Sequence, residues 1–215
     1  HYHDPEVLAL AKLVEADGKA KGLKGKPLRN YMRDRGAGPA VECYDVPDDA
    51  YKDGGVANRG VEQLERSKDS GQSFFLAVGF LKPHLPFVAP KKYWDLYDRA
   101  SLPLAPFQRA PDGSPDCAIG DYVEARIYGG VPSDGTISDT TQRELIHGYL
   151  ACVSYVDAQI GKLISKLKET GQYEDTVIVL WGDHGFHLGD KHLFGKHTNY
   201  EPVSYTHLTL PTNRC

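Results

Sequence analysis

Apolar residues recur along the chain at two kinds of spacing, which predict helices and strands in alternation. Positions three and four apart are apolar over residues 5–18, 56–68 and 141–171, as on the buried face of a helix. We expect the first of these helices to pack its apolar face against the rest of the domain. In the last one, Thr141 and Glu144 form a capping box. The chain therefore contains three predicted amphipathic helices.

Two continuous apolar runs, residues 73–81 and 176–181, are typical of strands buried on both faces. Each run follows a predicted helix, which indicates an α/β fold with a sheet flanked by helices. Residues 16–53 and 95–139 are rich in glycine, proline and charged side chains. This composition predicts two long surface segments with little regular structure, of the kind that often borders a site.

The composition is that of one globular domain. The chain has 215 residues, 40% of them apolar, and a formal net charge of -4. Basic residues form no run, so the sequence gives no support for nucleic-acid binding. The apolar runs are far shorter than the roughly 20 residues of a membrane span, so none is expected. The four cysteines form no CxxC pair, which indicates neither a zinc knuckle nor a disulfide framework.

The first predicted strand leads into two basic side chains. Lys82 and His84 follow it, and Pro83 and Pro86 restrict the backbone around them. Reactive groups in open α/β sheets gather at the carboxyl ends of strands, and cations fixed there suit an anionic ligand. The alternative is that His84 is an ordinary hydrogen-bonded loop residue.

The second predicted strand leads into Asp183 and His184, flanked by glycines. A carboxylate suits a hard cation such as Ca²⁺ or Mg²⁺, and an imidazole can ligate a softer metal or bind an anion. A plain turn is the alternative. We expect the histidines that follow to form a solvated loop surface and assign none of them to a metal: His187, His192 and His197.

Three segments, taken in order, resemble the sulfatase family. They are residues 75–87, which include the Lys-Pro-His element, residues 148–157 with Ser-Tyr and Asp, and the Gly-Asp-His-Gly sequence at 182–185. The likeness is greatest to the iduronate-2-sulfatase-like branch, which residues 45–48, Asp-Val-Pro-Asp, also fit. The resemblance covers about residues 40–201, and the combination of motifs is more specific than any one of them.

The resemblance implies an alkaline-phosphatase-like α/β fold, a mixed sheet flanked by helices, and hydrolysis of sulfate esters. It also implies bound Ca²⁺ and a formylglycine nucleophile made from a cysteine. By this likeness Asp183 and His184 match metal ligands. His84 and Lys196 match catalytic residues that hold the sulfate or assist the leaving group, and Lys82 is a further candidate for the substrate pocket. The implied partner is a sulfated sugar or polysaccharide, with specificity on loops such as residues 103–139.

Two departures from the family pattern bear on domain organisation. The nucleophile motif, Cys or Ser followed by x-Pro-x-Arg, does not occur, nor does the family's N-terminal aspartate pair that supplies other metal ligands. We therefore expect residues 1–201 to be a C-terminal piece of a sulfatase catalytic domain, with its N-terminal part missing and inactive alone. Residues 202–215 have no acidic side chain and read as translated adapter sequence. A periplasmic or secreted location is expected from the family.

Two other functions stay open at this point. A phosphatase or phosphodiesterase of the same superfamily also places Asp-His at a strand end, and an upstream Thr or Ser nucleophile would favour it. A sulfatase-like domain that binds carbohydrate without turnover is the other. An intact nucleophile motif in the whole protein would argue against a pure binder.

Overall fold

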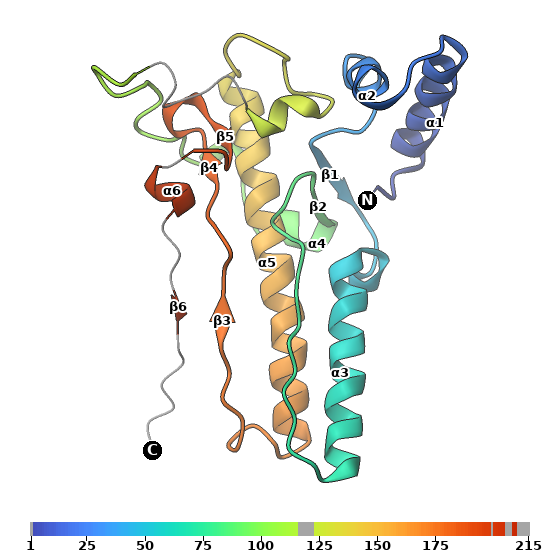
Figure 1. Ribbon diagram of the computed structural model, residues 1–215, viewed down its shortest axis with the longest axis vertical. Coiled ribbons are helices and arrows are strands. Elements are labelled where there is room, and N and C mark those ends of the chain that lie inside the picture. Colours follow the sequence, from blue (N-terminus) through green and yellow to red (C-terminus); the bar gives the residue numbers. More distant parts are fainter. Residues whose placement is uncertain (1, 116–122, 199, 205–207, 210–215) are drawn as a thin grey trace.

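Two long helices, each followed by an extended segment, form the frame of the molecule (Figure 1). Helix α3 (Lys52–Ser70) leads into residues 72–81, and helix α5 (Asp139–Glu169) leads into residues 175–181. In Figure 1 both helices run downward and both extended segments return upward, beside α5. The computed structural model describes residues 2–115, 123–198, 200–204 and 208–209.

Helix α5 begins earlier than the predicted capping box. Ser138 precedes it with extended backbone angles, and its hydroxyl accepts a hydrogen bond from the Thr141 N–H at 3.2 Å. Thr141 is already helical, so the prediction that it caps the helix with Glu144 is wrong, because a cap needs a non-helical backbone. Gly171, the predicted end, adopts a left-handed φ of 72° just beyond Glu169.

Two short parallel strands form the core with α5. Strand β1 (Val41–Tyr44) pairs with β2 (Phe87–Pro90), and every residue of β2 is buried. Gly148 of α5 lies against β2 so closely that a Cβ atom there would stand 2.9 Å from the Cβ of Phe87. Only a residue without a side chain leaves room here, so the helix packs closely on the side chains of the two strands at that point.

The same packing encloses one of the cysteines. Cys152 on α5 is fully buried, and its thiol donates to the carbonyl of Val88 at 3.5 Å. Burial raises the pKa of this thiol to about 12. Cys43 on β1, in contrast, is exposed.

The first fifty residues are more regular than predicted. Residues 16–53 contain helix α2 (Gly25–Arg33) and strand β1, where the sequence indicated an irregular segment. Helix α1 (Pro5–Ala20) is present as predicted, but it is not a packed helix, since Leu13 is 71% exposed and only Val14 and Gly18 are buried. Its main neighbour is α2, and contact with one short helix covers only a narrow stripe.

The two apolar runs are extended but not buried on both faces. Residues 73–81 join no ladder among the described residues, and Phe75 is 94% exposed. In residues 176–181 only strand β3 (Leu180–Trp181) is paired, antiparallel to β6 (Leu208–Thr209). Burial on both faces requires neighbouring strands, and the described residues supply too few of them. The prediction of two fully buried strands is therefore wrong for this chain.

A groove with a volume of about 1340 Å³ lies between the two extended segments. It follows the predicted apolar stripe of α5, whose side chains line it: Val156, Ile160, Leu163, Ile164 and Leu167. The exposed apolar faces of the runs and this stripe thus line one groove.

The remaining elements are short. Their bounds are α4 (Lys91–Trp94), η2 (Arg99–Ser101), η4 (Glu124–Ile127), β4 (His187–Leu188), η5 (Asp190–His192), β5 (Phe194–Gly195) and α6 (Glu201–Ser204). As predicted, the described part of residues 95–139 is irregular apart from short helical turns. Most of the predicted foreign tail, residues 202–215, lies outside the described residues. Among the helices that are described, none combines the length and apolar character of a bilayer-crossing segment.

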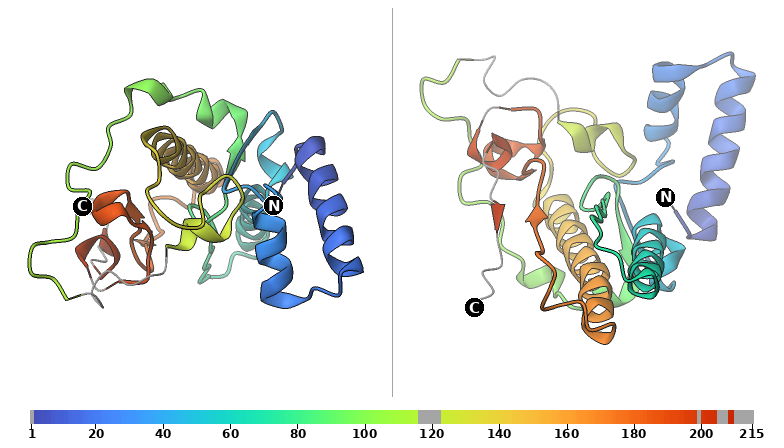
Figure 2. Two further views of the ribbon diagram at one scale, coloured as in Figure 1. Left: turned by 90° about the horizontal axis from the view of Figure 1, so that it is seen from above. Right: turned by 60° about the horizontal axis from the view of Figure 1, so that its bottom comes forward.

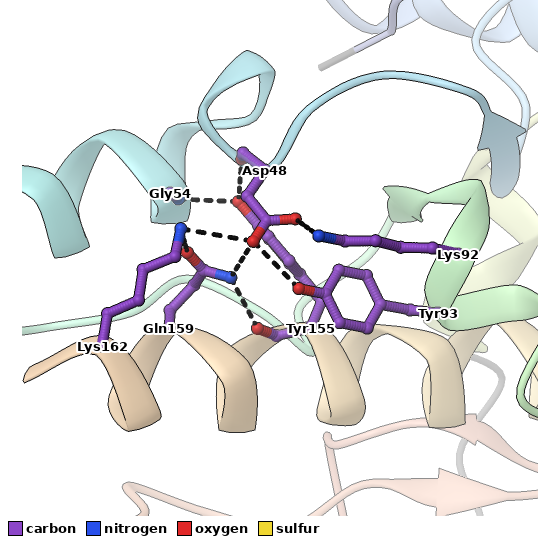
Figure 3. Close-up of polar contacts among 7 residues, drawn as sticks. All are labelled: Asp48, Gly54, Lys92, Tyr93, Tyr155, Gln159 and Lys162. Carbon is purple, nitrogen blue, oxygen red and sulfur yellow. Dashed lines mark hydrogen bonds and ion pairs between the residues drawn. The ribbon is translucent and has the colours of Figure 1, made fainter. Parts of the chain in front are cut away.

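One carboxylate ties the helices together (Figure 3). Asp48 of η1 (Asp48–Ala50) lies 2.7 Å from the Lys92 ammonium through Oδ1 and 3.2 Å from the Lys162 ammonium through Oδ2. Its Oδ2 also accepts hydrogen bonds from Gln159 at 3.2 Å and from the Tyr93 hydroxyl at 3.0 Å. The four partners come from α4 and α5, so one side chain fixes both elements against η1.

The backbone of Asp48 is held as well. Tyr155, fully buried on α5, donates its hydroxyl to the Asp48 carbonyl at 2.7 Å and accepts the Gly54 N–H at 2.6 Å. Burial alone would raise the pKa of Asp48, but hydrogen bonds from Lys92 and its other partners lower it to about 2. The ionised form is therefore the one that stabilises the fold.

The substitution Asp48→Asn is expected to lower the free energy of unfolding by roughly 2 kcal/mol at neutral pH, because two ammonium groups lose their counter-charge. Since the folded pKa lies below the ordinary 3.8, the contribution of Asp48 is present above pH 3.8 and is lost as the pH falls toward 2. Thermal or urea unfolding of the intact protein across this range measures it. Asp49→Asn, at an exposed neighbour, is the control, and an equal loss in both variants would contradict the prediction.

Candidate active site

The two predicted clusters lie along the same groove. Lys82 and His84 follow one extended segment, Asp183 and His184 follow the other, and all four line the groove together with Lys196. The two segments run in the same direction, so their carboxyl ends point to the same end of the molecule (Figure 1). All five predicted site residues thus belong to one concave surface.

Three aromatic rings connect the loops that carry these residues. Phe87 follows the His84 loop, Phe186 follows the His184 loop, and Tyr149 lies on α5. The ring centroids of Phe87 and Phe186 are 5.7 Å apart, and those of Phe87 and Tyr149 are 5.6 Å apart. Phe186 stacks on Tyr149 at 6.0 Å. Contacts of this kind fix the two loops relative to each other and to α5.

The His84 side chain is held by its own loop. Its Nδ1 lies 2.7 Å from the Leu85 carbonyl oxygen. A carbonyl oxygen only accepts hydrogen bonds, so the proton of this contact is on Nδ1. The other ring nitrogen, Nε2, is then the one available for chemistry, and the side chain is 41% exposed. The turn is closed by the His84 N–H, which donates to the Leu81 carbonyl at 3.0 Å.

Lys82 is directed into the loop instead of into solvent. The residue is 7% exposed, and its ammonium donates to the carbonyl oxygens of His84 at 3.0 Å and Pro86 at 2.5 Å. The N–H groups of Lys82 and Leu81 donate to the Asp53 carboxylate at 2.8 and 2.9 Å. Burial lowers the pKa of Lys82. These contacts make Lys82 a support for the backbone that presents His84.

Lys196 and His84 meet at a carboxylate that the sequence did not single out. The Lys196 ammonium lies 3.6 Å from Oε1 of Glu124, and Nε2 of His84 lies 3.7 Å from the same oxygen. Glu124 is only 5% exposed. It lies in the proline- and glycine-rich segment, where no motif or periodicity marks it, so no local signal in the sequence identified this residue.

Asp183 and His184 form a compact pair of candidate metal ligands. The Asp183 side chain is 86% exposed, and its Oδ2 lies 3.5 Å from Nε2 of His184. The His184 N–H donates to Oδ1 of Asp183 at 3.0 Å, and Nδ1 of the ring contacts the Gly185 carbonyl at 2.8 Å. One carboxylate and one imidazole fit part of a metal shell. The described residues contain no group of three or more His, Cys, Asp or Glu side chains arranged for a metal.

His187 is not part of a solvated loop surface, which corrects that prediction. The side chain is fully buried, with Nδ1 2.6 Å from the Asp190 carboxylate and Nε2 2.7 Å from the Thr198 hydroxyl. Burial alone would raise the pKa of Asp190, but its contacts with His187 and Lys191 lower it below the usual value. His187 therefore fastens the loop on both sides of Lys196. The prediction of exposure is confirmed for His192 and His197.

Comparison with known proteins bears on this arrangement. A model of the sulfatase family matches residues 17–207. The chain is 34% identical over 182 residues to iduronate 2-sulfatase of Homo sapiens, an alignment that covers 79% of this chain and 32% of that protein. It is 39% identical over 143 residues to a sulfatase of Formosa agariphila, covering 66% and 28% respectively. The chain spans about a third of the length of these relatives.

A solved structure shares the fold. The phosphonate monoester hydrolase from Silicibacter pomeroyi superposes with a TM-score of 0.63 and 31% sequence identity, covering 78% of this chain and 34% of that chain. The likeness confirms the expected α/β fold of the alkaline-phosphatase-like type. With a family match over nearly its whole length, this chain belongs to the sulfatase family.

Proposed function

We propose that the protein containing this chain hydrolyses sulfate esters. The observation that carries the proposal is that His84, Lys196 and the Asp183–His184 pair line one groove, in a chain that belongs to the sulfatase family. Because the chain spans about a third of its relatives and lacks the nucleophile motif, the proposal concerns the intact protein.

The chemistry requires positive charge beside the sulfuryl oxygens and a proton for the leaving group. The Lys196 ammonium would pair with the sulfate. His84 keeps one proton on Nδ1 through the Leu85 carbonyl, so a second proton on Nε2 is the one it would give to the departing alkoxide as the S–O bond breaks. A divalent cation such as Ca²⁺, held partly by Asp183 and His184, would neutralise further charge on the sulfuryl group.

We further infer that the substrate is a sulfated sugar or polysaccharide. The support is the 34% identity to iduronate 2-sulfatase and the long irregular segment beside the site. A formylglycine nucleophile and a periplasmic or secreted location are inferred from the family alone and stay predictions.

A second candidate function is hydrolysis of phosphate or phosphonate esters. It is favoured by the likeness to a phosphonate monoester hydrolase at 31% identity. The test is to measure kcat/KM of the intact protein on three esters under the same conditions: p-nitrophenyl sulfate, p-nitrophenyl phosphate and p-nitrophenyl phenylphosphonate. Highest efficiency on the sulfate supports the proposal, and a higher value on either phosphorus ester replaces it. Binding of sulfated sugar without turnover of any ester would identify a pure binding protein.

Asp183→Ala is expected to remove both bound divalent metal and sulfatase activity, because a carboxylate ligand is lost from a shell that prefers oxygen donors. Metal content by mass spectrometry and kcat are measured on the intact protein. Asp134→Ala, at an exposed aspartate outside the groove lining, should change neither. A metal-replete, fully active Asp183→Ala protein would refute the metal assignment.

His84→Ala is expected to reduce kcat by about 100-fold on an alkyl sulfate, because the alkoxide leaving group then lacks its proton donor. The loss should be much smaller on p-nitrophenyl sulfate, whose phenolate departs without protonation, and metal content should not change. The same factor on both esters would assign His84 to sulfate binding instead of acid catalysis.

A further inference from the structure

Glu124 is a buried carboxylate whose presence packing alone does not explain. Its side chain is 7% exposed, and Oε2 has no hydrogen-bond partner among the described residues. Burying an ionised carboxylate is costly unless opposite charges offset the lost hydration. A glutamine of the same shape would cost less free energy to bury here, so the negative charge itself requires an explanation.

The charge lies between two candidate catalytic groups. Oε1 of Glu124 is 3.6 Å from the Lys196 ammonium and 3.7 Å from Nε2 of His84. Both distances are within the range of an ion pair but longer than a hydrogen bond. Lys196 and a protonated His84 repel each other, and a carboxylate beside both offsets that repulsion.

The backbone holds Glu124 at this point. Gly195 immediately precedes Lys196, and a Cβ atom there would stand 3.1 Å from the Glu124 nitrogen and 3.3 Å from its Cβ. Turn η4 therefore packs against β5 at a position where a side chain would crowd it. Within the β4–β5 ladder, Gly195 is also paired with the fully buried His187. The position of the carboxylate relative to Lys196 is thus set by packed backbone.

We propose that Glu124 is a positioning residue for the hydrolysis proposed above, on which this inference rests. Its carboxylate keeps the His84 imidazole and the Lys196 ammonium close together while both carry positive charge. Glu124 itself is not among the described residues that line the groove, so it acts through these two side chains and does not touch the substrate.

The test compares two variants of the intact protein. Glu124→Gln keeps the shape and removes the charge, and is expected to reduce kcat on an alkyl sulfate by about 10- to 100-fold, as for carboxylates that orient histidines elsewhere. Glu124→Asp keeps the charge and should recover part of the loss. Glu144→Gln is the control, since Glu144 is partly exposed, pairs with Arg99 at 3.1 Å and lies outside the groove lining.

Two readouts separate positioning from a merely structural role. The loss in Glu124→Gln should be smaller on p-nitrophenyl sulfate than on the alkyl sulfate, with the melting temperature near that of the wild type. In a His84→Ala background, Glu124→Gln should have a smaller effect than in the wild type, because only its contact with Lys196 remains and coupled residues are not additive.

Several results would overturn the inference. They are full activity of Glu124→Gln, equal losses on both esters, additive losses with His84→Ala, or no recovery in Glu124→Asp. If the wild type proves to hydrolyse phosphorus esters instead, the same single and double variants are compared on alkyl and nitrophenyl phosphorus esters. The role of Glu124 is then judged separately from the identity of the ester.

Discussion

The Asp48 carboxylate connects the parts of the chain on which the remaining structure is built. Its partners lie on α4 and α5, and Tyr155 holds its carbonyl and the start of α3 at once. These donors offset the cost of placing a charge in a largely buried environment. The direction of α5 relative to α3 therefore follows from one short turn, and both extended segments lie beside α5 (Figure 2).

The site depends on this frame through α5. Tyr149, in the first half of the helix, contacts the aromatic residue that follows each of the two loops. His84 and the Asp183–His184 pair are thus positioned against the same rigid element. Lys196 is positioned differently, by the short β4–β5 ladder and the buried His187. Glu124 lies next to both Lys196 and His84 and so connects the two parts of the site.

The sequence predicted those features that depend on near neighbours. The three main helices follow from apolar spacing and from glycines such as Gly71 and Gly171, which adopt left-handed angles just past α3 and α5. The burial of residues 73–81 could not be predicted, because it depends on strands that pair with them. Glu124 was missed for a related reason: it is 40 residues from His84 and 72 from Lys196 along the chain. The five candidate site residues could be singled out because recognisable motifs contain them.

The enclosed thiol of Cys152 has a practical consequence. Its contact with Val88 and its raised pKa leave it unreactive for as long as α5 stays on β2. An alkylating reagent meets Cys43 at the surface without any such opening. The rate at which Cys152 becomes labelled in the native protein is therefore a measure of how often the central helix lifts from the strand beneath it, a local opening that neither turnover nor melting records.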